Sequence, residues 1–228
     1  MPGSVPDSFS DGFDGEFSRL FSEAGWRKPI GPAEALRRWQ DFADDCLAGF
    51  PWDVEDYNND LTLRSRIAEV LPALDVAGHD RARRLAEEIE AADSRVRSVL
   101  RSESFSRFPE EQWWLRRSPA YACRRFCADF HEAYGVEVEP RSRFDDDVRE
   151  MIRLSATGLP VSDVLIHARD ESLYASVRSG LLFRAFREAF PAAGRTRQDR
   201  QLVLRWISGG VEDAELRSGL AGEQSGKG

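Results

Sequence analysis

The chain has 228 residues, of which 41% are hydrophobic and 32% are charged, a composition typical of a soluble globular protein. No apolar run approaches the ~18 residues of a membrane-spanning helix, and three cysteines are too few for a disulfide framework. We therefore expect a cytoplasmic protein without a membrane span. The net charge of −8 arises wholly in residues 1–60, which hold 5 basic and 13 acidic residues, and it disfavours nucleic acid as the default partner.

Residues 1–25 are rich in Ser, Gly and Asp and are predicted to form a flexible acidic arm. Glycines in this arm weaken a helix by about 1 kcal/mol each relative to alanine. Large aromatics nevertheless recur every four residues, and in a helix they would form one apolar stripe. They are Phe9, Phe13, Phe17 and Phe21. We expect the stripe to dock on the chain's own domain, and a groove of a partner protein is the alternative.

A helical unit is predicted at 26–104, because apolar residues recur there at spacings of three and four. A first stripe runs from Leu36 to Phe50, and a second reaches Leu74, with Pro72 predicting a kink or break. The third stripe is the most regular and predicts a long helix packed lengthwise on a neighbour. Its members are Ala82, Leu85, Ile89, Ala92, Val96 and Val99.

A second helical unit is predicted at 105–221, followed by a polar tail at 222–228. Residues 101–118 are polar and aromatic and are expected to connect the two units. Apolar stripes beyond them predict further helices near 123–134, 148–157, 173–190 and 202–207. No alternating strand pattern of useful length occurs, so the predicted fold class is all-α, a multi-helix bundle-like domain.

One cluster of potential zinc ligands lies on a predicted helix. Cys123, Cys127 and His131 follow one another at intervals of four residues, and thiolate and imidazole groups bind zinc. The spacing is not that of common zinc sites, and unpaired cysteines are often buried in cores. We therefore predict no metal at these residues.

Carboxylates gather at two further places without completing a cation-binding motif. Residues 56–60 begin like an EF-hand loop, but Leu61 and Ile67 stand where glycine and glutamate are required. Asn59 or Asp60 is instead expected to cap a helix, and the acids at 145–147 are expected to lie in a first helical turn. Phosphate-binding and serine-hydrolase motifs are also missing, so no cofactor is predicted. A small all-α enzyme with a carboxylate and arginine site stays an alternative.

Two segments of the second unit, 148–170 and 202–220, each predict a helix, a glycine-containing turn and another helix. A weak repeat at an offset of 50 residues links them. The matching residues are Val161 with Val211, and Asp163 with Asp213.

The first of these segments suggests an alternative function in DNA binding. Between residues 149 and 205 there are 10 arginines against 6 acids. Arg153 and Arg169 are the side chains that would contact phosphates in a helix–turn–helix regulator. The second segment carries acids at the same place, which argues against this function.

The favoured prediction is a helical protein-interaction or regulatory module without its own catalysis. Its candidate binding residues are the phenylalanines of the arm and the aromatic–basic run Trp113, Trp114, Arg116 and Arg117. Trp and Arg are enriched at binding hot spots. Since adjacent residues face different ways, we expect one Trp to lie in the core and the other at the surface. The partner is expected to be a protein, and no oligomeric state is predicted.

Overall fold

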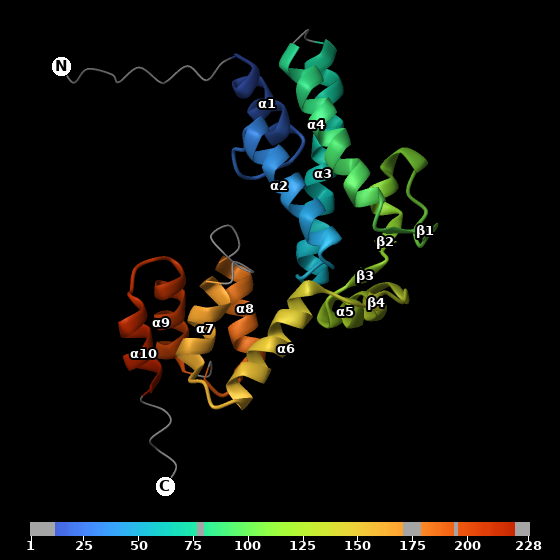
Figure 1. Ribbon diagram of the computed structural model, residues 1–228. Coiled ribbons are helices and arrows are strands. Elements are labelled where there is room, and N and C mark those ends of the chain that lie inside the picture. The colour runs from blue at the N-terminus through green and yellow to red at the C-terminus, as the bar shows by residue number, and fades with distance from the viewer. Residues whose placement is uncertain (1–11, 77–79, 171–178, 194–195, 222–228) are drawn as a thin grey trace, which may run out of the picture. The chain divides into compact units, whose positions relative to one another are not determined.

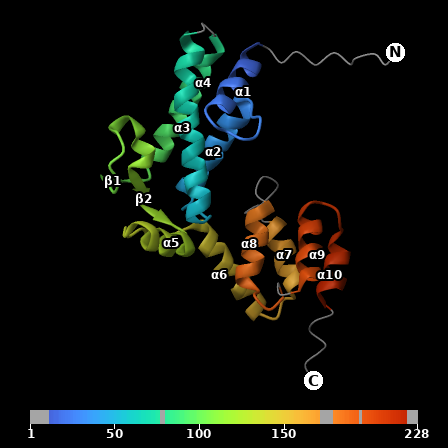
Figure 2. The same ribbon diagram turned by 180° about the vertical axis from the view of Figure 1, so that it is seen from behind.

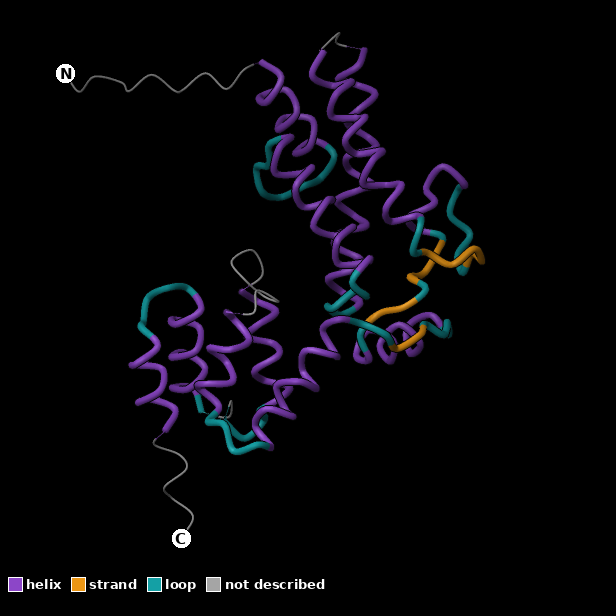
Figure 3. Tube along the Cα trace, viewed as in Figure 1, coloured by secondary structure: helices purple, strands orange, loops and turns teal. Residues whose placement is uncertain are grey.

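The computed structural model describes residues 12–76, 80–170, 179–193 and 196–221 (Figure 1). Helices make up most of these residues and the strands are short (Figure 3), which confirms the predicted all-α class. The chain divides into two compact units, an N-terminal unit, Met1–Arg141, and a C-terminal unit, Ser142–Gly228. The boundary thus follows Arg141 and not residue 104, where the sequence suggested it.

Five α-helices build the described part of the N-terminal unit. They are α1 (Gly12–Glu23), α2 (Pro32–Leu47), α3 (Val54–Val76), α4 (Asp80–Arg97) and α5 (Arg124–Tyr134). α2 and α4 pack along each other, and all six members of the regular stripe at 82–99 are buried. This confirms that the third stripe forms a long helix packed lengthwise on a neighbour.

The segment between α4 and α5 explains the position of the boundary. The 3-10 helix η1 (Glu110–Leu115) lies between two antiparallel strands, and two further strands pair in parallel. These are β1 (Leu100–Ser104) with β2 (Arg117–Pro119), and β3 (Tyr121–Ala122) with β4 (Glu139–Pro140). On α5, the ring of Phe126 lies 5.4 Å from that of Phe50 and 5.3 Å from that of Tyr57. α5 therefore completes the core that the preceding helices begin.

α3 shows neither a break at Pro72 nor a helix cap at Asn59 or Asp60. The helix continues through Pro72 to Val76. Pro72 is exposed near the helix end, where its missing N–H removes only one backbone hydrogen bond. Asp60 lies inside the helix and caps nothing, because α3 begins at Val54 and the Asp53 carboxylate accepts from the Asp56 N–H at 3.1 Å.

The aromatic stripe of residues 1–25 belongs to the core over its described part. Phe13, Phe17 and Phe21 are buried on α1, which packs against α3 and α2, and the rings of Phe17 and Phe21 stack at 5.1 Å. Docking on the chain's own domain, the favoured expectation, is thus what the structure shows for 12–23. The three side chains are core residues and not an exposed binding surface. Phe9 lies outside the described residues.

Over the described residues after Arg141, five α-helices build the C-terminal unit. They are α6 (Arg143–Ala156), α7 (Val161–Asp170), α8 (Ser179–Ala189), α9 (Arg197–Ile207) and α10 (Asp213–Ala221). α7 contacts α6, α8 and α10 and buries half of its residues, so it is the central helix of the unit. Both views place α9 and α10 side by side at one edge of the unit (Figure 2). None of the described helices combines the length and apolar composition that crossing a bilayer requires.

Candidate functional site

The first predicted helix–turn–helix segment is a capped hairpin of α6 and α7. The Ser142 hydroxyl accepts from the Asp145 N–H at 3.0 Å and donates to the Asp145 carboxylate at 2.9 Å, which fixes the start of α6. Gly158, with φ of +92°, provides the left-handed residue that follows the helix end. The Pro160 carbonyl then accepts from the backbone N–H groups of the first turn of α7. Asp145 and Asp146 therefore lie in the first turn of α6, as predicted, whereas Asp147 follows that turn and is buried.

The second hairpin, α9 and α10, is built in the same way. The Thr196 hydroxyl accepts from the Asp199 N–H at 3.0 Å, and Gly209 follows the end of α9 with φ of +77°. Both hairpins thus begin with a hydroxyl residue, an arginine, a variable residue and an aspartate, at 142–145 and 196–199. The repeat therefore includes the starts of α6 and α9 as well as the matches at an offset of 50 residues. The two starts do not fall at that offset, because α6 is longer than α9.

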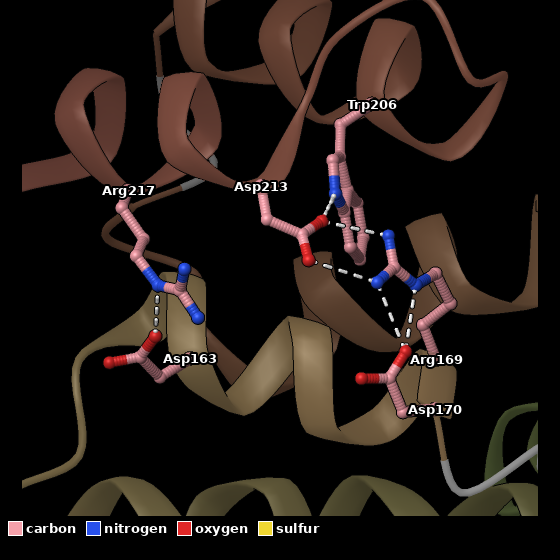
Figure 4. A network of polar contacts seen from close by, with 6 residues as sticks. All are labelled: Asp163, Arg169, Asp170, Trp206, Asp213 and Arg217. Carbon is pink, nitrogen blue, oxygen red and sulfur yellow. Dashed lines mark hydrogen bonds and ion pairs between the residues drawn. The ribbon is translucent and has the colours of Figure 1, made fainter.

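Three side chains, here called the clasp, join the two hairpins at the start of α10 (Figure 4). They are Arg169, Trp206 and Asp213. The Asp213 carboxylate accepts from Arg169 Nη1 at 2.8 Å and Nη2 at 3.1 Å, and from Trp206 Nε1 at 2.7 Å. The hydrogen bond from Arg169, followed by that from Trp206, lowers the pKa of Asp213. Arg169 also donates to Asp170, and its guanidinium lies 4.8 Å from the centre of the Trp206 ring.

A second ion pair closes the other end of the same helix pair. Arg217 Nε on α10 donates to Asp163 in the first turn of α7 at 2.7 Å (Figure 4). In each of the two helices, α7 and α10, an aspartate of the first turn therefore forms an ion pair with an arginine of the other helix. Because α7 is linked to α10 near both ends, the two hairpins are held in one register.

These contacts bear on the DNA-binding alternative. Arg169 directs its guanidinium to Asp170 and Asp213, and Arg153 donates to Glu150 at 2.6 and 2.7 Å. A phosphate would have to displace two carboxylates at the partly buried Arg169, whereas the exposed Arg153–Glu150 pair is a weaker obstacle. α7, the helix in the position of a recognition helix, is largely buried, with His167 among its few exposed side chains. DNA binding stays a prediction that these contacts do not favour.

An aspartate, an arginine and a tryptophan, the residue types of the clasp, are also hydrogen-bonded to one another in the N-terminal unit. Asp93 accepts from Trp39 Nε1 at 2.8 Å and from Arg64 Nε and Nη2 at 2.8 and 2.6 Å. Asp93 is 0% exposed, whereas the clasp at Asp213 is half-exposed. The Arg64 guanidinium also lies 4.3 Å from the centre of the Trp114 ring. Sequence reasoning missed both sites, because their members come from separate helices.

The aromatic–basic run proposed as an epitope forms part of the wall of the N-terminal unit. Trp114 is buried and donates to Ser65 Oγ at 3.0 Å, whereas Trp113 is half-buried under the Arg97 guanidinium at 4.3 Å. One Trp is therefore in the core and the other near the surface. Arg116 and Arg117 are half-buried, and Arg116 lies 3.7 Å from the Glu110 carboxylate.

The predicted thiol cluster does not converge on one point. Cys123 Sγ contacts the Trp52 carbonyl at 3.7 Å, and Cys127 Sγ contacts the Ala122 carbonyl at 3.5 Å. His131 Nδ1 lies 3.1 Å from the Glu137 carboxylate. Within the described ranges, no three His, Cys, Asp or Glu side chains gather as a metal site.

Asp60 on α3 is an ionisable group whose environment favours the protonated form. The pKa of this carboxyl is raised from 3.8 to about 7, chiefly by burial and next by the nearby Asp56 carboxylate; Arg38 opposes the shift and Asp41 adds to it. Since the folded-state pKa exceeds the unfolded one, the folded chain binds this proton more tightly. Its contribution to stability is fully present below about pH 4 and is lost as the pH rises to about 7.

We therefore expect Asp60→Asn to remove part of the loss of stability between mildly acidic and mildly alkaline pH. Urea unfolding at about pH 5 and about pH 8 measures the effect. The variant should exceed the unaltered chain in stability at the higher pH. Glu55→Gln changes an exposed acid on the same helix and is the control. An equal pH dependence in all three proteins would contradict the assignment.

The outward side of α6 carries an apolar line, here called the α6 stripe: Val148, Ile152, Ala156 and Leu159. Ile152 is 47% exposed, and Leu159, just after the helix, is 41% exposed. Val148 and Ile152 stand one turn apart on one face. Leu204 on α9 is also 47% exposed, but the exposed residues one turn from it are polar. The α6 stripe thus has four apolar members, whereas Leu204 has only the half-buried Ile207 as an apolar neighbour one turn away on its exposed side.

No family model matches this chain, and no curated protein or solved structure matches it. The function proposed below therefore depends on the contacts, burial and charges of the chain itself.

Proposed function

We propose that the protein is a helical protein-binding module whose contact surface is the α6 stripe. The observation that supports this function is the exposure of Ile152 and Leu159 on one hairpin, with Val148 and Ala156 beside them. Isolated exposed aliphatic residues are normal on protein surfaces. A line of them at helical spacing is the pattern by which one helix docks on another or in a groove. We further propose a reducing, cytoplasmic compartment, which suits three cysteine thiols.

The clasp supports this function by making the hairpin rigid. Arg169, Asp213 and Trp206 hold α7 against the second hairpin, and α6 packs on α7 and α8. A surface that is ordered before it binds loses less conformational entropy on association. The α6 stripe is thus carried by a preformed helix, and not by a segment that must fold on its partner.

The charges beside the stripe indicate the chemistry of the partner. Arg149 and Arg153 lie on the exposed side of α6 and form ion pairs with Asp146 and Glu150 of the same helix. Exposed pairs of this kind contribute only about 0.2–1 kcal/mol, so a partner's carboxylate can replace them at little cost. We propose an amphipathic helix with an apolar stripe and flanking acids as the bound segment.

Substitution of Ile152 tests the function. Ile152→Glu places a charge in the centre of the stripe, and we expect a loss of at least about tenfold in affinity, which corresponds to about 1.4 kcal/mol. The immobilised full chain captures its partner from an extract of the source cells, and titration with the purified partner then measures the dissociation constant. Circular dichroism verifies that each variant is folded.

Leu204→Glu is the matched control, because Leu204 is as exposed as Ile152 and lies outside the stripe. It should bind like the unaltered chain. Equal binding by Ile152→Glu and Leu204→Glu would refute the α6 stripe as the contact surface. Arg153→Glu should also lower the affinity for an acidic partner. Unchanged affinity in that variant would refute the proposed charge of the partner.

A further inference from the structure

The N-terminal unit contains a small groove between α1, α2 and α4. Its apolar lining includes Phe13, Leu36 and Leu85, and its charged lining consists of two arginines, Arg81 and Arg84, and one acid, Glu88. The groove has a volume of about 220 Å³, below the roughly 300–1,000 Å³ of pockets that bind small molecules. Its size suits a single side chain presented by a peptide.

The arginines at this groove stand at an unfavourable end of their helix. α4 begins at Asp80, and Arg81, Arg83 and Arg84 follow within its first turns, where the helix dipole disfavours positive charge. One acid of α1 already compensates, since Asp14 lies 3.0 Å from Arg81. The Arg81 guanidinium also lies 4.7 Å from the centre of the Phe13 ring. The groove thus already contacts one aromatic residue and one acid of the N-terminal segment.

We infer that this groove binds the chain's own residues 7–11, with the Phe9 ring in the apolar lining and Asp7 and Asp11 near the arginines. Phe9 stands four residues before Phe13, so it continues the stripe whose described members are all buried. Two residues, Ser10 and Asp11, lie between Phe9 and Gly12, where α1 begins, so the Cα atoms of Phe9 and Gly12 are at most about 11 Å apart. Residues 1–11 contain two acids and no lysine or arginine, which complements a groove whose lining holds two arginines and one acid.

Nuclear Overhauser effects in the full chain test the location of Phe9. With leucine methyl groups labelled, we expect effects from the Phe9 ring to the methyl groups of Leu36 and Leu85, and their loss in Phe9→Ala. They should persist unchanged on tenfold dilution. Absence of these effects in the unaltered chain would overturn the inference. Effects seen only between labelled and unlabelled molecules would also overturn it, because the occupant would then be a second copy.

Thermal unfolding provides an independent readout. Phe9→Ala is expected to lower the melting temperature of the full chain by about 2–4 °C, the shift of a modest loss of burial in a domain of this size. Phe108→Ala, which truncates a ring that is 48% exposed on the same unit, should leave it unchanged. Equal melting temperatures for Phe9→Ala and the unaltered chain would overturn the inference. Neither measurement involves the α6 stripe, so this inference and the proposed function can fail separately.

Discussion

Replacing Asp93 by alanine should lower the free energy of unfolding of the N-terminal unit by about 3–5 kcal/mol, the cost of breaking a buried ion pair. Asp93 is fully buried and accepts hydrogen bonds from Trp39 and from two nitrogens of Arg64. The variant would leave a buried guanidinium and an indole N–H without their acceptor. Denaturant unfolding followed by far-ultraviolet circular dichroism measures the difference.

The second site with the same residue types gives the control. Asp213→Ala removes an acceptor of the same kind from Arg169 and Trp206, but this clasp is half-exposed and water can replace the lost bonds. A cost of about 1 kcal/mol or less is expected. The double variant Arg64→Met, Asp93→Leu should recover much of the stability that Asp93→Ala loses, since no uncompensated charge remains. Similar losses in Asp93→Ala and Asp213→Ala would contradict the role given to burial.

The second large effect is expected for Phe17→Ala. Phe17 is fully buried on α1 and stacks on Phe21, so its truncation leaves a cavity under α1 as well as losing burial. Phenylalanine to alanine changes in cores cost about 3–5 kcal/mol. Denaturant unfolding of the full chain measures the loss.

Phe108→Ala supplies the comparison within the same unit, because Phe108 is 48% exposed. Its effect should stay within about 0.5 kcal/mol, as for most surface substitutions. A Phe17→Ala variant as stable as Phe108→Ala would show that α1 does not contribute to the core. The aromatic stripe would then again be a candidate for binding a partner.

Periodicity alone predicted much of the helical architecture. The stripe at 82–99 predicted α4 because every third or fourth residue is apolar, and the same residues are buried in the structure. The turns after α6 and α9 could also be placed, because Gly158 and Gly209 each follow a helix end. These features depend on residues that are close in sequence, where local geometry decides the outcome.

Features that depend on distant residues could not be predicted in this way. Arg64 and Asp93 are 29 residues apart, and Arg169 and Asp213 are 44 apart. Many arginines and aspartates in this chain could form such pairs, and no spacing rule selects these two. The boundary after Arg141 was missed for a related reason, since α5 joins the N-terminal unit through ring contacts with Phe50 and Tyr57.

The placement of Trp206 in the clasp has a practical consequence for spectroscopy. It is the only one of the six tryptophans that follows Arg141, so its emission comes from the C-terminal unit alone. Its indole donates to Asp213 within the second hairpin and faces the guanidinium of Arg169 on α7, a cationic neighbour that is lost when the second hairpin separates from α7. The difference in fluorescence between the unaltered chain and Trp206→Phe therefore isolates an optical signal for the opening of the C-terminal unit.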